Sequence, residues 1–319
     1  MSERVVLVCP GGATSAVGIH RLAEETGAGV VAVAVDLDRG EDPEAFRQRA
    51  LAGGAVRAEV VDARDEFADR YCLPALRANA LRPASALYPP LVAEHLVGAA
   101  ARHGATAVAH GCAGHDGVRL EAGIRALAPD LRVLALVHDH VPHPADRTPP
   151  VDPGDPDELV DPDELVITFD RGRPVAIDGE TVTMLQAVQE LNRRAGARGS
   201  GRGARVHETP GAVALTTAHR GLEDATLEPD LARFKRRVER RWGELVRDGL
   251  WFSPLKRALD SFIDDTQPHV SGEVRLVLHG ARAVVADRRG EPPLPDFSQG
   301  PASPRCLPTK IAAKRDSIT

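Results

Sequence analysis

The chain has 319 residues, of which 43% are hydrophobic and only 3% are aromatic, and its formal net charge is −6. This length allows one large domain or two ordinary ones, and the acidic balance excludes long-range electrostatic attraction to nucleic acid. No apolar run approaches the ~20 residues that span a bilayer, and the first residues lack a signal-peptide pattern, so we expect a cytoplasmic protein.

Short apolar runs alternate with helical patterns over residues 1–137. Strands are predicted at 5–9, 29–37, 58–61, 106–111 and 131–137, and helices at 14–26, 42–51, 87–103 and 117–127. This alternation predicts an α/β domain whose parallel sheet is covered on both faces. Ligands of such sheets bind at the carboxyl ends of the strands, so the loops after Cys9, Leu37 and His110 should be neighbours.

The pattern changes at residues 138–165, which are rich in Pro and Asp and repeat the sequence DPDELV. Proline at this density disfavours helix and central strand, which predicts a linker. The linker contains HDHVPH, a spacing typical of metal ligands, but no scaffold surrounds it and we predict no metal site.

A second, smaller domain is predicted over residues 166–287. Its expected elements are a hairpin at 166–177, a helix at 182–195, a strand near 212, helices at 231–250 and 255–266, and paired strands at 272–279 and 282–286. Residues 288–319 contain several prolines and no periodicity, which predicts a disordered tail.

The first strand ends in CPGGATS, directly before a predicted helix. Gly11 and Gly12 would let the main chain approach a phosphate group, and the hydroxyls of Thr14 and Ser15 would add donors at the helix N-terminus. However, Pro10 lacks an amide donor and the lysine of a Walker A loop is absent. A plain strand-to-helix turn is therefore the alternative interpretation.

Two more polar regions fall at the same predicted edge. Asp36 closes the second strand and could bind an adenosine hydroxyl or a metal, or could simply end the strand and cap the next helix. The stretch AHGCAGHDGVRLE offers His110, His115, Asp116 and Arg119 to a ligand, with Arg119 one helical turn beyond His115. Its alternative interpretation is a solvated helix start with Asp116 as the N-cap.

Several colinear stretches resemble the argininosuccinate synthase family. The most specific are TTAHRGLEDATL (216–227) and GLWFSPLKRALDSFIDDTQPHVSGEVRLVL (249–278), and AHGCAG with DGVRLE adds to them in the first half. The resemblance implies a PP-loop domain (adenine nucleotide alpha hydrolase-like, Rossmann-like) followed by an α+β synthetase-type domain. It also implies an ATP-dependent ligase that adenylates citrulline, condenses it with aspartate and releases AMP and pyrophosphate, with ATP and Mg²⁺ as cofactors.

The resemblance also carries over individual residues. It implies ATP-binding roles for Gly11, Gly12, Thr14, Ser15, Asp36 and Gly111, and substrate-binding roles for Ser85, Asp116, Arg119 and His207. It implies small-molecule substrates and a homo-oligomer without the C-terminal arm of the family, and it identifies no catalytic residue. Neither nucleic acid nor membrane is an expected partner.

The chain departs from the family on the ligand side. The family loop SGGxDTS is here PGGATSA, and the citrulline-binding segments shrink to LRPASALYPP at residues 81–90. Each missing polar partner costs roughly 1–3 kcal/mol where its counterpart stays buried. Two hypotheses stay open: a ligase with altered substrates, or a catalytically inactive homologue that serves as a binding or scaffold protein.

Overall fold

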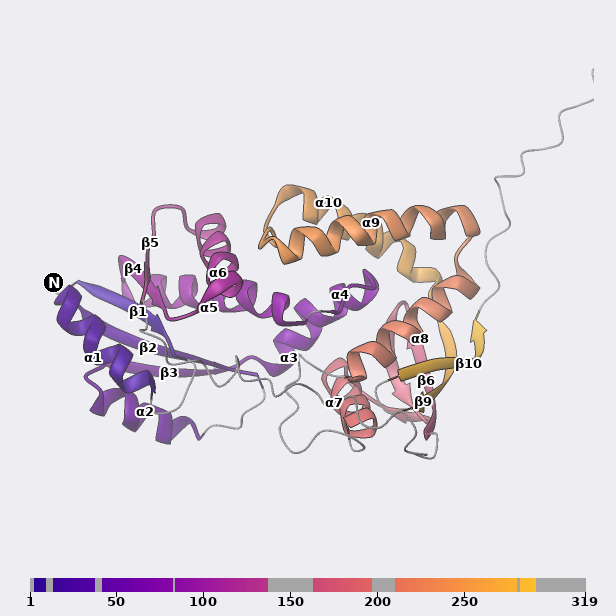
Figure 1. The fold of residues 1–319 in the computed structure, drawn as a ribbon, viewed down its shortest axis with the longest axis horizontal. Helices are drawn as coiled ribbons and strands as arrows, with labels where there is room; N and C mark the ends of the chain where they lie inside the picture. Colours follow the sequence, from indigo (N-terminus) through magenta and orange to yellow (C-terminus); the bar gives the residue numbers. More distant parts are fainter. Residues whose placement is uncertain are drawn as a thin grey trace, which may run out of the picture.

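The computed structural model describes residues 3–9, 14–37, 42–82, 84–136, 163–196, 210–279 and 282–290. Two five-stranded sheets lie at opposite ends of an elongated molecule (Figure 1). Within the described residues, no helix combines the length and the apolar character needed to cross a membrane.

The first sheet is parallel, with strand order β3-β2-β1-β4-β5. Its strands are β1 (Arg4–Val8), β2 (Gly29–Asp36), β3 (Arg57–Asp62), β4 (Ala107–His110) and β5 (Arg132–Ala135). The helices that cover it are α1 (Thr14–Thr26), α2 (Pro43–Ala52), α5 (Tyr88–His103) and α6 (Gly114–Leu127). The predicted α/β fold is confirmed, and β1 lies between β2 and β4, so the ends of these three strands are adjacent.

Apolar residues of β1 alternate between the two faces of this sheet. Val5 and Leu7 belong to the core formed with α1 and α2, whereas Val6 and Val8 belong to the core formed with α5 and α6. Because both faces are buried, the strands consist of nearly continuous apolar residues. This leaves the strand ends as the edge at which polar side chains can gather.

Residues 64–87 form short helical segments that the sequence did not reveal. They are α3 (Arg64–Phe67), the π-helical turn η1 (Ala68–Cys72), α4 (Leu73–Arg77) and the 3-10 turn η2 (Ala84–Leu87). Phe67, Tyr71 and Leu76 pack in one core with the second sheet, and the rings of Tyr71 and Trp251 lie 4.9 Å apart. The N-terminal part of the chain therefore supplies core residues to the second half.

The second sheet is antiparallel, with strand order β10-β9-β6-β7-β8. Its strands are β6 (Asp163–Asp170), β7 (Arg173–Ile177), β8 (Glu180–Thr181), β9 (Gly272–His279) and β10 (Arg282–Gly290). The turn between β6 and β7 falls at Arg171 and Gly172, as predicted, and both residues have positive φ (48° and 71°). Two-residue hairpins favour such a turn because its twist matches that of the strands.

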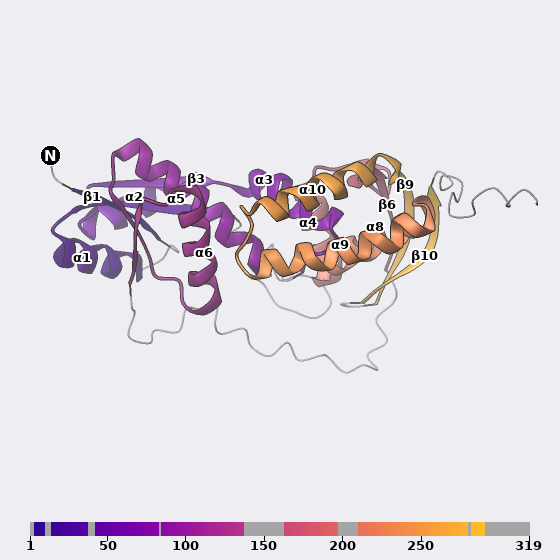
Figure 2. The same cartoon turned by 90° about the horizontal axis from the view of Figure 1, so that it is seen from above.

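The helices of the second half are α7 (Met184–Gly196), α8 (Pro210–Thr226), α9 (Pro229–Arg247), α10 (Pro254–Thr266) and the 3-10 turn η3 (Gln267–His269). Seen from above, α9 and α10 run side by side along this half (Figure 2). Helix α6 lies next to the ends of α9 and α10 that their connecting loop joins. The strand predicted near residue 212 is wrong, because this segment begins α8. Its buried residues Ala214, Leu215, Ala218 and Leu222 recur at helical spacing.

Two boundaries of the second half also differ from the prediction. Strand β6 begins at Asp163, within the predicted linker, and β10 continues to Gly290, into the predicted tail. Arg288 and Gly290 pair with Val274 and Gly272 of β9. Pairing across the sheet thus extends the strand beyond the apolar pattern from which its end was predicted.

Candidate functional site

The carboxyl edge of the parallel sheet brings together the ends of β1, β2 and β4. The amide of Cys9, just after β1, donates to the carbonyl of Val33 at 2.8 Å, so the chain stays on the sheet one residue beyond β1. The strand order reverses between β1 and β4, since the chain moves to one side for β2 and to the other for β4. Such a switch point opens a crevice at the carboxyl ends, where parallel sheets bind ligands.

Asp36 ends β2 beside Asp62, the last residue of β3. Arg64 donates from Nε to one oxygen of Asp62 at 2.9 Å and from its terminal nitrogen to the other at 2.6 Å, and these hydrogen bonds lower the pKa of Asp62. Asp36 is half-buried. Its alternative role as a helix cap is wrong, because Asp42 caps α2 by accepting from the amide of Glu44 at 3.0 Å.

His110 ends β4 with its side chain only 1% exposed. Neither ring nitrogen has a hydrogen-bond partner among the described residues, and Nε2 lies 3.6 Å from the nearest Glu121 oxygen. Burial lowers the pKa of His110, which favours the neutral ring. A buried polar ring without a hydrogen-bond partner is unusual, and here it directly precedes the exposed Gly111 of the β4–α6 loop.

The loop from β4 into α6 is closely packed against the helix. A Cβ on Gly117 would lie 2.8 Å from the carbonyl oxygen of Cys112 and 3.5 Å from the ring of His110, so only glycine fits there. Ala113 is the N-cap of α6 and its side chain makes no capping hydrogen bond. The interpretation of Asp116 as the N-cap is therefore wrong, and the first amides of α6 lack a side-chain cap.

Arg119 joins the two halves of the molecule. One of its terminal nitrogens donates to Asp116 at 2.9 Å, and its Nε donates to the carbonyl oxygen of Arg247 at 2.7 Å. Gly249, at φ +77°, allows this approach, because a Cβ there would lie 2.9 Å from the Cα of Arg119. The helical spacing suggested a shared face for Arg119 and His115, but Arg119 pairs with Asp116 instead.

The sequence missed the part that the second half plays in this contact. Neither Arg247 nor Gly249 carried a signal, since one contributes a backbone oxygen and the other contributes the absence of a side chain. Only the pairing of two distant segments in space reveals them.

The remaining predicted residues are less fully described. Ser85 lies in η2, just before α5, and is half-buried. Thr14 and Ser15 begin α1, next to the carboxyl edge, but the structure does not describe their side chains. Gly11, Gly12 and His207 lie outside the described residues, as does the HDHVPH stretch.

A second polar cluster is buried in the other half of the molecule. The Nζ of Lys235, on a side chain 1% exposed, lies 2.8 Å from a Glu223 oxygen and 2.6 Å from a Glu239 oxygen. It also donates to the carbonyl oxygen of Arg77 at 2.6 Å. All three hydrogen-bond donors of this ammonium group therefore have acceptors within reach.

Amide side chains complete this buried network. Asn79 donates to Glu223 at 2.6 Å and to Glu239 at 2.9 Å, while its oxygen lies 3.0 Å from Nδ1 of His219. Nε2 of His219 lies 3.0 Å from the amide oxygen of Gln267. Burial acts to raise the pKa of Glu223, but the nearby charges of His219 and Lys235 and its hydrogen bonds bring it below the usual value. The donors of Lys235 and Asn79 all have acceptors within the network, which indicates a structural role.

The fold defines a class: a Rossmann-like α/β domain with a switch point in its strand order, followed by an α+β domain. Comparison with family models identifies the family within this class. Residues 4–146 match the arginosuccinate synthase N-terminal HUP domain, and residues 152–300 match the arginosuccinate synthase C-terminal domain. The chain belongs to the argininosuccinate synthase family, whose members at family level are ligases with a nucleotide-binding HUP domain.

The residues at the carboxyl edge fit an adenine nucleotide in several respects. The exposed Gly111 and the start of α6, which has no side-chain cap, provide amide donors next to the switch point between β1 and β4. No group of three His, Cys, Asp or Glu side chains among the described residues could hold a metal ion by itself.

Proposed function

We propose that the chain is an ATP-dependent C–N ligase of the argininosuccinate synthase type, acting on citrulline or a related ureido or carboxyl substrate and on aspartate or another amine. The observation that supports it most is the order of two matched family domains along one chain, the first with a switch point in its parallel sheet. A cytoplasmic location, small-molecule substrates and a part in arginine biosynthesis belong to this proposal.

The resemblance to the family supplies the residue roles in this proposal. Amides and hydroxyls of Gly11, Gly12, Thr14 and Ser15 would bind phosphate, and Asp36 with Gly111 would bind the adenosine, with Mg²⁺ on the phosphates. Ser85, Asp116, Arg119 and His207 would bind the two amino-acid substrates. A guanidinium such as that of Arg119 suits a substrate carboxylate, and a carboxylate such as that of Asp116 suits a substrate ammonium group.

When bound, ATP supplies the adenylyl group that converts the ureido oxygen of citrulline into a leaving group as pyrophosphate departs. The amine of aspartate then forms the new C–N bond, AMP departs with that oxygen, and the amine proton passes to solvent. The buried His110 is not positioned to exchange this proton, because its ring is 1% exposed. The chain contributes binding and orientation of the reacting groups.

The test is pyrophosphate release by the purified protein with ATP, Mg²⁺ and pairs of amino acids, beginning with citrulline and aspartate. The proposal expects release that requires both amino acids and yields AMP in equal amount. Release with neither this pair nor any other ureido or carboxyl substrate paired with an amine would remove the proposal.

One observation favours a second function, a catalytically silent homologue that acts through binding. Arg119 is held by Asp116 and by the carbonyl oxygen of Arg247, so two of its donor groups are already used within the protein. On this alternative, the melting temperature does not change when ATP and Mg²⁺ are added. Binding at a hundredfold excess over Kd would instead stabilise the protein by about 2.7 kcal/mol.

A further inference from the structure

A cavity of about 440 Å³ lies between the chain after α4, α8 and α9, away from the carboxyl edge of the parallel sheet. This volume is in the range of pockets that hold small molecules. Its charged lining residues are Arg82, Arg220, Arg236, Arg240, Arg247 and Glu239. Five guanidinium groups and one carboxylate thus line this cavity.

Helix α9 supplies one wall by its periodicity. Arg236, Arg240 and Arg247 recur at intervals of four and seven residues, which places them on one face of the helix. Gly243 lies on the same face, and a Cβ there would approach a terminal nitrogen of Arg247 to 3.3 Å and the Cβ of Ala80 to 3.5 Å. The missing side chain leaves space at the base of the cavity.

The single carboxylate of the cavity already has cationic partners within the protein. Glu239 lies 2.6 Å from the buried Nζ of Lys235 and 3.9 Å from the guanidinium of Arg220. Arg236 pairs with Asp224 at 2.7 Å. Within the described ranges, no carboxylate lies within ion-pair distance of Arg82 or Arg240.

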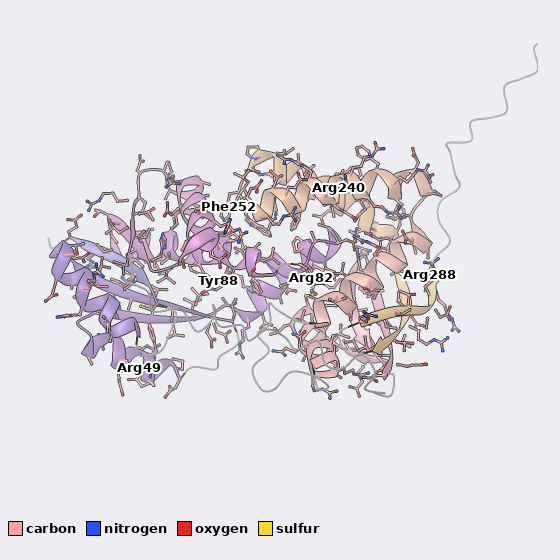
Figure 3. All side chains as sticks on the ribbon, in the orientation of Figure 1. Arg49, Arg82, Tyr88, Arg240, Phe252 and Arg288 are labelled. Atoms are coloured by element: carbon pink, nitrogen blue, oxygen red, sulfur yellow. The ribbon has the colours of Figure 1, made fainter. Side chains whose placement is uncertain are left out.

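Figure 3 labels these two residues, Arg82 on the chain that follows α4 and Arg240 on α9. They come from segments far apart in the sequence, which residues 64–87 bring together by packing in the second core. Guanidinium groups bind phosphate and carboxylate oxygens in a planar, two-pronged geometry. The surplus positive charge of the cavity therefore predicts an anionic ligand.

We propose that this cavity binds a compact polyanion that carries at least two phosphate or carboxylate groups. Because arginines line both walls, a ligand with two or more anionic groups offers acceptors to both walls at once. The site is linked to the carboxyl edge, because the carbonyl oxygen of Arg247 accepts from Arg119. The proposal concerns Arg82 and the arginines of α8 and α9, and it does not depend on ATP chemistry.

The test is calorimetric titration of the whole protein at low ionic strength with inorganic pyrophosphate, citrate and orthophosphate. We expect saturable binding of pyrophosphate or citrate, about tenfold or more tighter than that of orthophosphate. Tighter pyrophosphate would identify a phosphate ligand, and tighter citrate a carboxylate ligand. Because pyrophosphate is also a product of the proposed ligase, only the binding that is lost with the cavity arginines counts.

Two double variants distinguish anion binding in the cavity from nonspecific attraction to the positive charge of α9. R82Q with R240Q should weaken binding by about tenfold or more. The matched control, R233Q with R237Q, removes two exposed arginines of α9 that do not line the cavity and should change the affinity less than about twofold. Equal weakening by both pairs, or no saturable binding to the unmodified protein, overturns the proposal.

A measurement on the unmodified protein avoids any dependence on the folding of variants. Phenylglyoxal modifies accessible arginines, and the sites are counted by mass spectrometry with and without the tighter-binding anion. We expect protection of Arg82 and Arg240 and none of Arg237. Equal modification of all three in the presence of the anion contradicts the proposal.

Discussion

The two polar clusters of this protein differ in how completely they are satisfied. The cluster around Lys235 and Glu223 is buried, and its donors and acceptors face one another at 2.6–3.3 Å. The carboxyl edge instead leaves both ring nitrogens of His110 without a hydrogen-bond partner among the described residues and the start of α6 without a side-chain cap. Both clusters contain His and acidic residues, so satisfaction of hydrogen bonds, and not residue type, separates a structural cluster from a candidate site.

The largest expected effect is a loss of stability when the buried Lys235 cluster is broken. Lys235→Met leaves Glu223 and Glu239 buried without their cation, which should lower the free energy of unfolding by about 3–5 kcal/mol. The control is Arg233→Met in the same helix, which breaks an exposed pair with Asp230 and should cost about 1 kcal/mol or less. Urea unfolding of the two variants measures both values. Equal losses would contradict a structural role for the Lys235 cluster.

A smaller effect tests the contact between the halves. Gly249→Ala places a Cβ 2.9 Å from the Cα of Arg119 at a positive φ, and it should cost about 2–4 kcal/mol. Gly104→Ala at φ +60° is the matched control, because no atom lies within 4 Å of the added Cβ and only the backbone strain of about 1–2 kcal/mol remains. Thermal unfolding compares them, and an equal cost would show that the approach of Gly249 to Arg119 is not tight.

The next prediction concerns the pH dependence of the unfolding free energy. The folded-state pKa of Glu223 is below its unfolded value, so this group stabilises the fold above about pH 4.3 and the contribution is lost as pH falls through the folded value. The difference in unfolding free energy between the native protein and Glu223→Gln should therefore shrink as pH is lowered. A difference that stays constant from neutral to acid pH would contradict the charge pairing.

The smallest effect on stability should accompany a large effect on activity. Arg119→Lys keeps the charge but loses the Nε donor to Arg247, which should cost about 1 kcal/mol or less of stability. If Arg119 binds a substrate carboxylate, kcat/KM should fall about tenfold or more. Arg125→Lys, on the same helix and paired with Glu121, is the control and should leave kcat/KM unchanged. A native value for Arg119→Lys would remove Arg119 from the proposed site.

The sequence predicted the parallel sheet well, because its strands and helices have distinct apolar patterns that local segments carry by themselves. It also placed Asp36, Asp116 and Arg119 near the strand ends or on the following helix. It missed residues 64–87 and misread the start of α8, because their burial depends on partners far along the chain, such as Trp251 and Ile167. The contact of Arg119 with Arg247 was unpredictable for the same reason.

The most direct measurement follows the ureido oxygen of citrulline. The protein is incubated with ATP, Mg²⁺, aspartate and citrulline labelled with oxygen-18 in the ureido group, and AMP is analysed by mass spectrometry. The ligase proposed here transfers the labelled oxygen to AMP, one label for each argininosuccinate formed. Unlabelled AMP, or no AMP above a control without protein, would contradict it.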